Sequence, residues 1–133
     1  MADFDLLDSV NLFTNREIKY TKEPKDNWQY PQETLDKKTG DCEDYAILKA
    51  WRLFKHGVPC SDMSLGYFAT PLDTRHVMLL VKGTYKKLFS RKIVDCTYLL
   101  DNRTNDIYRL GQTKDKLLSQ VKVDKYVNHP QGG

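Results

Sequence analysis

Apolar residues recur at the spacing of an α-helix in the first half of the chain and follow the pattern of β-strands in the second half. Residues 4–14 place apolar side chains on one helical face, and residues 41–56 carry the widest apolar face of the chain. Gly57 stands where the residue after a helix commonly takes a left-handed conformation, so it marks the end of the second helix. Residues 31–35 begin with proline and predict a short helix, whereas the polar segment 17–30 predicts a loop.

The pattern changes to that of β-strands after the helix over residues 41–56. Several segments are rich in β-branched and aromatic residues and are separated by turn residues. We expect antiparallel strands over residues 63–70, 75–82 and 91–101, and a short fourth strand over 106–110. Helices followed by strands are typical of a domain in which the two kinds of element form separate layers. The sequence therefore predicts an α+β fold with N-terminal helices packed on an antiparallel sheet.

Length and composition indicate an ordinary globular domain. We expect the 133 residues to form a single domain, 1–133, with a core over about residues 10–110 and a flexible tail over residues 124–133. The net charge of +3 is small and dispersed, which argues against a nucleic-acid-binding protein. No stretch approaches the roughly 18 apolar residues of a membrane span, and the N-terminus lacks the pattern of a signal peptide.

One cysteine lies in an unusual sequence environment. The chain has three, Cys42, Cys60 and Cys96, without a C-x-x-C pair, which argues against a disulfide framework and a zinc site. Cys42 lies in the stretch TGDCEDYAILKAW, at the predicted start of a helix. A helix N-terminus stabilises a thiolate, whereas flanking acids oppose a further negative charge. The residues alone leave three interpretations of Cys42: a buried core thiol, a metal ligand or a nucleophile.

A nucleophilic thiol needs a general base, and histidine is the usual one. His56 lies at the far end of the helix that begins near Cys42, roughly 20 Å away by helical rise, and is better interpreted as a C-terminal cap. His129 lies in the tail. His76 opens an apolar strand, where it also fits a structural role, but it is the histidine that can reach Cys42. We therefore favour His76 as the base.

A catalytic histidine in turn needs an orienting group, and two aspartates qualify. Asp95 and Asp101 lie in one predicted strand and on one face of it, so the alternation of side chains does not separate them. A regular hairpin centred near residues 86–88 would place either aspartate within a few residues of the position opposite His76. Both stay open as the orienting residue at this level of reasoning.

Several motifs together resemble those of a known family. These are VNLFTNREIKY, GDCEDYAI, GVP, HVMLLV and YLLDNRTNDI, which run from about Val10 to Leu110, and GDCEDYAI is the most specific of them. The chain resembles the bacterial transglutaminase-like cysteine proteinases, and within them the LapG-like branch. The resemblance implies a papain- and transglutaminase-like core, in which the nucleophile begins a helix that packs on an antiparallel sheet.

The resemblance also implies a set of catalytic residues. The family's Cys-His-Asp triad falls on Cys42, His76 and Asp101, the last of them in the motif LLDN. The interval of 25 residues between His76 and Asp101 is longer than the family leads us to expect, so Asp95, at 19 residues, remains the alternative. The chain is also short, as a minimal or phage-encoded member would be.

A calcium site is a further implication of the resemblance. LapG-like members bind calcium through the acids that flank the cysteine, which are Asp41 and Glu43 here. Two side chains do not fill a calcium shell of 6–8 ligands, so Asp44, backbone carbonyls or water would have to complete it. The alternative is that these acids only stabilise the N-terminus of the helix.

The chemistry expected from these residues is acyl transfer. We expect a cysteine peptidase that hydrolyses peptide bonds of a protein or peptide substrate, with the Cys42 amide and the Trp28 indole as candidate oxyanion donors. A packing role for Trp28 is the alternative. A transglutaminase or amidase on the same triad and a non-catalytic binding module are the competing functions. A cytoplasmic or phage-associated location is expected, or a periplasmic one if a signal peptide has been removed.

Overall fold

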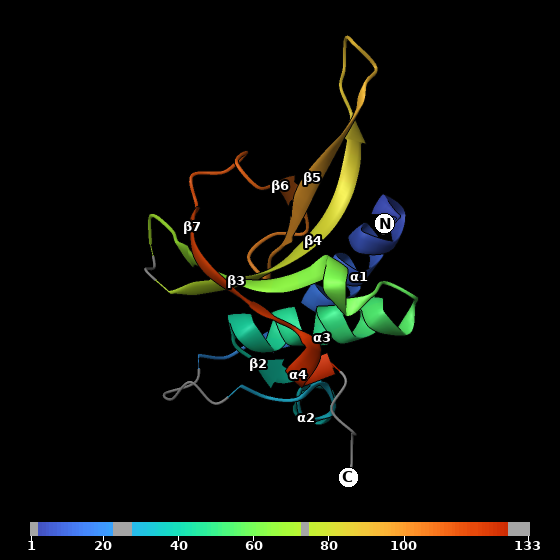
Figure 1. Cartoon of the computed structure of the whole chain (residues 1–133). Helices are drawn as coiled ribbons and strands as arrows, with labels where there is room; N and C mark the ends of the chain where they lie inside the picture. The colour runs from blue at the N-terminus through green and yellow to red at the C-terminus, as the bar shows by residue number, and fades with distance from the viewer. Residues whose placement is uncertain (1–2, 23–27, 73–74, 128–133) are drawn as a thin grey trace.

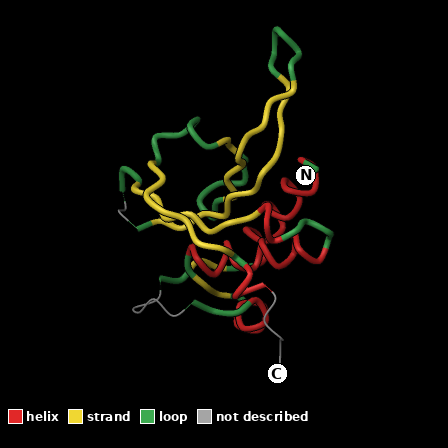
Figure 2. Tube along the Cα trace, viewed as in Figure 1, coloured by secondary structure: helices red, strands yellow, loops and turns green. Residues whose placement is uncertain are grey.

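The computed structural model of the protein describes residues 3–22, 28–72 and 75–127. They form a layer of helices on one side of an antiparallel sheet, as Figures 1 and 2 show, and the α+β class predicted from the sequence is confirmed. None of the described helices is long and apolar enough to cross a bilayer. The helical elements are α1 (Phe4–Glu17), α2 (Pro31–Lys37), α3 (Cys42–Lys55), the 3-10 turn η1 (Cys60–Asp62) and α4 (Asp124–Val127).

The main sheet has, within the described residues, five strands in the order β6-β5-β4-β3-β7, and every neighbouring pair is antiparallel. A separate, two-residue parallel pair, β1 with β2, lies in the connections that lead into and out of α2. The strands are β1 (Lys19–Tyr20), β2 (Thr39–Gly40), β3 (Met63–Ala69), β4 (His76–Lys86), β5 (Ile93–Leu100), β6 (Tyr108–Arg109) and β7 (Lys116–Lys122).

Helix α3 forms the centre of the core because its apolar face packs on the middle of the sheet (Figure 1). Side chains of β4 alternate between the two faces of the sheet, as the pleat of a strand requires. One set of them joins the large apolar cluster around α3, and the other set joins a smaller cluster on the opposite face. The first set is Val77, Leu79 and Val81, and the second is Met78 and Leu80.

The boundaries of α3 follow from its sequence. Asp41 is the N-cap residue, and the helix ends at Lys55 with His56 as its C-cap. Gly57 then takes a left-handed conformation with φ of +97°, which favours glycine. The ring of His56 contacts the carbonyl of Arg52 at 2.8 Å, so this histidine lies at the far end of the helix from Cys42, as predicted.

The C-terminal part of the fold differs from the prediction. Residues 116–122 form the edge strand β7, although the sequence analysis predicted no strand there. The start of the expected flexible tail, Asp124–Val127, forms helix α4, and Val127 is buried in the core cluster. The core therefore extends past residue 110, because Val123 and Val127 pack in the same apolar cluster as the side chains of α3. The remaining tail residues, with His129 among them, lie outside the described residues.

The hairpin that joins β4 and β5 is also longer than predicted. Strand β4 continues to Lys86 and pairs there with Ile93, the first residue of β5. A short loop over residues 87–92 closes the hairpin, which projects from the rest of the molecule at the top of Figure 1. The ladder is therefore centred between residues 89 and 90, two to three positions later than the sequence analysis assumed.

Candidate active site

The first turn of α3 is held by a network of carboxylate and amide groups. Asp41 and Asp44 form a capping box, in which each side chain accepts a hydrogen bond from the amide of the other residue. Asp44 also accepts a hydrogen bond of 2.8 Å from the amide of Gln29. A Cβ atom at Gly40 would lie 2.6 Å from the Cβ of Asp44, so only glycine fits there. This network holds the N-terminus of α3 in place, and with it Cys42, the first residue of the helix.

The sulfur of Cys42 lies between a carboxylate and a backbone amide. Its thiol donates a hydrogen bond of 3.2 Å to Glu43 Oε2, and the amide of Val77 approaches Sγ at 3.4 Å. Burial, with the nearby charges of Glu43 and Asp41, raises the pKa of the Cys42 thiol to about 12, although the Val77 amide opposes the shift. The resting group is therefore a neutral thiol, and the helix N-terminus alone does not make it a thiolate.

The imidazole of His76 contacts the carboxylate of Asp101. The Nε2–H group donates a hydrogen bond of 2.8 Å to Asp101 Oδ1, and both side chains are buried. The thiol of Cys42 contacts the backbone amide of Val77, the residue that directly follows His76, so both groups lie at the start of β4. With Nε2 bonded to the carboxylate, Nδ1 is the ring nitrogen that remains to accept a proton.

Arg103 holds the other side of the Asp101 carboxylate. Its amide donates to Oδ1 at 3.0 Å and its Nε donates to Oδ2 at 2.8 Å, while its guanidinium also pairs with Asp115. Burial alone would raise the pKa of Asp101, but the hydrogen bonds from His76 and Arg103 outweigh it and hold that pKa well below its usual range. Asp101 is therefore ionised and fixed in orientation.

Two asparagines of α1 support the loop that carries Asp101. Asn15 donates a hydrogen bond of 3.0 Å to the Asp101 carbonyl, and Asn11 donates one of 3.2 Å to the carbonyl of Thr104. Lys49 of α3 donates in turn to the side chain of Asn11 at 2.7 Å. Lys49 is fully buried, and this burial lowers its pKa to about 7. These supporting residues were not identified from the sequence, although both asparagines lie in the motif VNLFTNREIKY.

Asp95, the alternative orienting residue, lies far from His76. It pairs with Thr84 in the β4–β5 ladder, and its side chain is exposed. Thr84 is eight residues beyond His76 along β4, which corresponds to roughly 26 Å at the rise of a strand. The prediction that either aspartate would lie nearly opposite His76 is wrong for Asp95, because the longer hairpin shifts the register.

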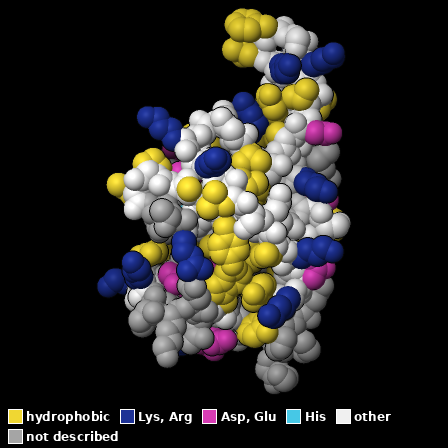
Figure 3. Space-filling view, turned by 60° about the vertical axis from the view of Figure 1, so that its left-hand side comes forward, with side chains coloured by type: hydrophobic (Ala, Val, Ile, Leu, Met, Phe, Trp, Pro, Cys, Tyr) yellow, Lys and Arg dark blue, Asp and Glu magenta, His cyan; other side chains and the backbone are white. Residues whose placement is uncertain are grey.

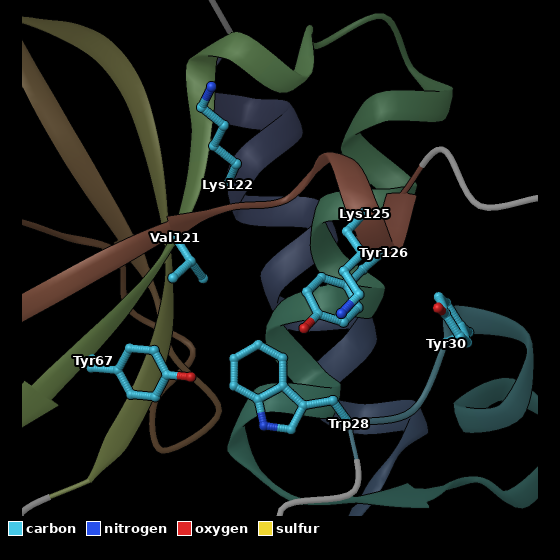
Figure 4. A pocket seen from close by; sticks show the side chains of 7 residues that line it. All are labelled: Trp28, Tyr30, Tyr67, Val121, Lys122, Lys125 and Tyr126. Carbon is cyan, nitrogen blue, oxygen red and sulfur yellow. The ribbon is translucent and has the colours of Figure 1, made fainter.

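Trp28 lies in a cleft lined with aromatic rings (Figure 4). The centre of its ring is 5.9 Å from that of Tyr67 and 5.3 Å from that of Tyr126. One lining residue, Tyr67, pairs in the β3–β4 ladder with Val77, the residue whose amide contacts Cys42. We name this cavity of about 470 Å³ the aromatic cleft, and its lining residues are Trp28, Tyr30, Tyr67, Val121, Lys122, Lys125 and Tyr126.

The ring contacts of Trp28 account for its presence in a loop, since they bury part of the indole against two tyrosines. They agree with the packing role that the sequence analysis gave as the alternative. A role of the indole N–H as an oxyanion donor stays a prediction.

Three buried carboxylates stand next to the cysteine, and they are the candidate calcium ligands. Asp41, Glu43 and Asp44 are all buried, and burial raises the pKa of Asp44 to about 7. Hard carboxylate oxygens are the donors that calcium prefers, so the chemistry of the set fits this ion. Within the described part of the chain, however, no three His, Cys, Asp or Glu side chains are placed to hold a metal ion together. Backbone oxygens or water would have to complete a shell.

Comparison with known proteins finds solved structures of similar fold. Three structures of Legionella pneumophila LapG are similar to the chain, each over 90% of its length. One matches with a TM-score of 0.73 and 27% identity, and its calcium-bound form with 0.73 and 26%. An EGTA-treated form matches with 0.72 and 26%. No curated protein sequence matches the chain significantly.

These matches bear on both the fold and the family. The chain spans 63–65% of the length of the LapG chains, and the predicted transglutaminase-like fold is confirmed by the match. The family model of the bacterial transglutaminase-like cysteine proteinases matches residues 2–128, which is nearly the whole sequence. By this match, which confirms the resemblance seen in the motifs, the chain belongs to the family of bacterial transglutaminase-like cysteine proteinases.

Proposed function

We propose that the chain is a cysteine peptidase in which Cys42 is the nucleophile, His76 the general acid–base and Asp101 the residue that orients His76. One observation carries this proposal: the amide of Val77 contacts the Cys42 sulfur, and the residue directly before it, His76, hydrogen-bonds Asp101. Membership of a cysteine proteinase family supports the same reaction class. A protein or peptide is accordingly the proposed substrate.

The proposed reaction begins when His76 Nδ1 accepts the thiol proton and the Cys42 sulfur attacks a peptide carbonyl. The Cys42 amide, at the positive end of α3, is the proposed donor to the resulting oxyanion. The C–N bond then breaks, the leaving amine takes the proton from His76, and a thioester to Cys42 remains. Water attacks the thioester with His76 as base, which releases the acid product and restores the thiol.

Asp101 acts in this scheme through His76. An ionised carboxylate that accepts from Nε2–H selects the neutral tautomer in which Nδ1 carries the lone pair, and it stabilises the imidazolium that forms during attack. Arg103 shares the charge of Asp101, so we propose that it fixes the carboxylate plane and prevents it from rotating away.

The aromatic cleft is the proposed entry for the substrate. Cys42 is only 8% exposed, so a peptide has to approach from a neighbouring depression in the surface. Its lining residue Tyr67 pairs with Val77 in the β3–β4 ladder, and the cleft offers apolar rings and two lysines, features that suit an extended peptide chain. If the acceptor were an amine rather than water, the same site would act as a transferase, and mass analysis of the products separates the two.

Replacing Glu43 by glutamine should make Cys42 more reactive. Glu43 accepts a hydrogen bond from the thiol and adds a negative charge, both of which raise the pKa of Cys42, so neutralising Glu43 favours the thiolate. We expect alkylation by iodoacetamide at pH 8, in EGTA, to become several-fold faster, up to about tenfold for each unit by which the pKa falls. Peptide mass analysis measures the rate at Cys42, with Cys96 as an internal reference.

The matched control for this change is Asp8→Asn, which removes an exposed carboxylate on α1 and should leave the rate at Cys42 unchanged. An unchanged rate in Glu43→Gln would contradict the proposed effect of Glu43. If Cys42 is alkylated no faster than Cys60 both in the wild type and in Glu43→Gln, the result would count against a nucleophilic role of Cys42.

We also propose that Asp41 and Glu43 contribute to a calcium site. Calcium would neutralise the carboxylates beside Cys42 and so favour its ionisation. Calorimetric titration of the chain should therefore detect binding, and calcium at 100 times its dissociation constant should stabilise the fold by about 2.7 kcal/mol.

The double variant Asp41→Asn/Glu43→Gln should lose calcium binding, whereas the exposed pair Asp5→Asn/Asp8→Asn should keep it. Thermal unfolding in calcium and in EGTA gives a readout that does not depend on activity. An absence of heat at millimolar calcium, together with equal unfolding temperatures in the two conditions, would remove this proposal.

A further inference from the structure

The loop at the end of the β4–β5 hairpin exposes large apolar side chains to solvent. Leu88 is 83% exposed and Phe89 is 94% exposed, far from the core clusters. The loop is nevertheless ordered by backbone hydrogen bonds, from the Lys87 amide to the Lys92 carbonyl at 2.8 Å and from the Arg91 amide to the Lys87 carbonyl at 3.0 Å. The two apolar side chains therefore stay in solvent, on the hairpin that projects from the rest of the molecule in Figure 1.

Basic side chains surround these two apolar ones. The segment 86–92, KKLFSRK, contains four lysine or arginine residues and no acidic residue, and all of its residues are exposed. Figure 3 shows the same combination, with apolar and basic side chains gathered at the hairpin tip. We name this segment the hairpin tip. Its local charge of +4 stands out in a chain whose net charge is +3.

We propose that the hairpin tip docks on an anionic lipid surface, with Leu88 and Phe89 among the acyl chains and the basic side chains at the phosphates. Exposed apolar residues flanked by lysine and arginine are typical of segments that lie in a membrane interface. Long basic side chains can keep their charges in the headgroup region while their stems cover apolar surface.

A lipid surface suits the hairpin tip better than a pocket of a partner protein. A closed protein pocket that received Leu88 and Phe89 would have to remove water from the neighbouring cations, which costs free energy unless each finds a partner. Lipid headgroups leave those cations hydrated and supply negative charge on every side of the tip. The charge complementarity therefore favours a bilayer as the occupant.

Docking through the tip would leave the candidate active site open. His76 is the first residue of β4 and the hairpin tip begins at its last residue, Lys86, so the two lie at opposite ends of an 11-residue strand. At the rise of a strand this separates them by roughly 35 Å. The inference does not depend on the proposed peptidase activity, because it concerns only the far end of the hairpin.

Sedimentation with vesicles tests the proposal. The whole chain should bind vesicles of phosphatidylcholine mixed with phosphatidylserine, bind vesicles of phosphatidylcholine alone much less, and dissociate as salt is raised. Lys87→Ser/Lys92→Ser should lower the partition coefficient by about 25-fold, at about fivefold for each charge. Leu88→Ser/Phe89→Ser should lower it at least about tenfold.

Matched controls lie elsewhere on the surface. Leu72→Ser removes an apolar side chain that is 99% exposed, and Lys19→Ser/Lys22→Ser removes two exposed lysines. Both variants should bind the mixed vesicles as the wild type does. In Phe89→Trp, addition of anionic vesicles should shift the tryptophan emission to shorter wavelength, a shift that the wild-type chain should not show. Equal binding to neutral vesicles, no binding at low salt, or full binding by the tip variants would each overturn the proposal.

Discussion

Replacing Cys42 by alanine is expected to abolish peptide hydrolysis and to leave the fold intact. In the proposed mechanism no other group can form the thioester, so we expect kcat to fall by at least about 10⁴. The change deletes one buried sulfur atom, which should destabilise the fold by only about 1–2 kcal/mol. Hydrolysis of an unfolded protein substrate, followed by mass analysis, measures the first effect, and thermal unfolding measures the second.

Cys60 provides a closely matched control for this variant. It belongs to the same apolar cluster as Cys42 and is 9% exposed, against 8% for Cys42. Cys60→Ala should therefore show a similar small loss of stability with full activity. If Cys42→Ala keeps its activity, the thiol is not the nucleophile. If it unfolds while Cys60→Ala stays folded, the core-thiol interpretation of Cys42 is the better one.

The parts of the fold that the sequence predicted well are those with a strong apolar period. Helix α3 has a wide apolar face and a glycine after its end, and both boundaries lie within one residue of the prediction. Strand β3 likewise consists mostly of apolar residues, and its side chains are all buried or partly buried. In these segments, burial of the apolar face determines the local structure, so the spacing of apolar residues is enough to predict the element.

Strand β7 could not be predicted in the same way. It is an edge strand that pairs on one side only, with β3, and its seven residues are mostly exposed. An exposed edge strand needs little apolar alternation, because its backbone hydrogen bonds to the neighbour hold it in place. Only the partner strand, which is remote in sequence, determines that residues 116–122 are extended.

The support of the candidate site was likewise hidden in the sequence. Asn11, Lys49 and Arg103 look like ordinary polar residues of helices and loops, and nothing in their spacing relates them to one another. Their importance comes from long-range contacts, in which each side chain bonds a group from another part of the chain or from the Asp101 carboxylate. A polar residue on an apolar helix face, such as Asn11 beside Leu7 and Val10, was the available signal.

Identifying the orienting aspartate from the sequence depended on the position of the turn between β4 and β5. An error of two to three residues in the centre of the β4–β5 hairpin moves every cross-strand partner by about twice that number. Asp95 and Asp101 therefore could not be separated until the register was known, in which Leu79 pairs with Leu100 and Thr84 with Asp95. With this register, replacing Asp101 and replacing Asp95 are expected to have very different effects on activity.

Replacing Asp101 by asparagine should lower kcat by about 10³–10⁴, an effect of the size known for the corresponding change in serine proteases. An amide at this position can present its NH₂ group to His76 Nε2, which favours the tautomer with the proton on Nδ1, where it cannot accept one from Cys42. The neutral amide also stops stabilising the imidazolium. Steady-state kinetics across pH measures the loss.

Asp95→Asn is the control, since its side chain is exposed and pairs with Thr84, and it should leave kcat unchanged. A merely structural role of Asp101 would predict lost stability with normal turnover in the folded fraction. The mechanism instead predicts a folded protein whose activity is low across the pH range, because the amide that replaces the Asp101 carboxylate cannot become charged at any pH. Loss of activity in Asp95→Asn with retention in Asp101→Asn would refute the proposed roles of both residues and with them the triad.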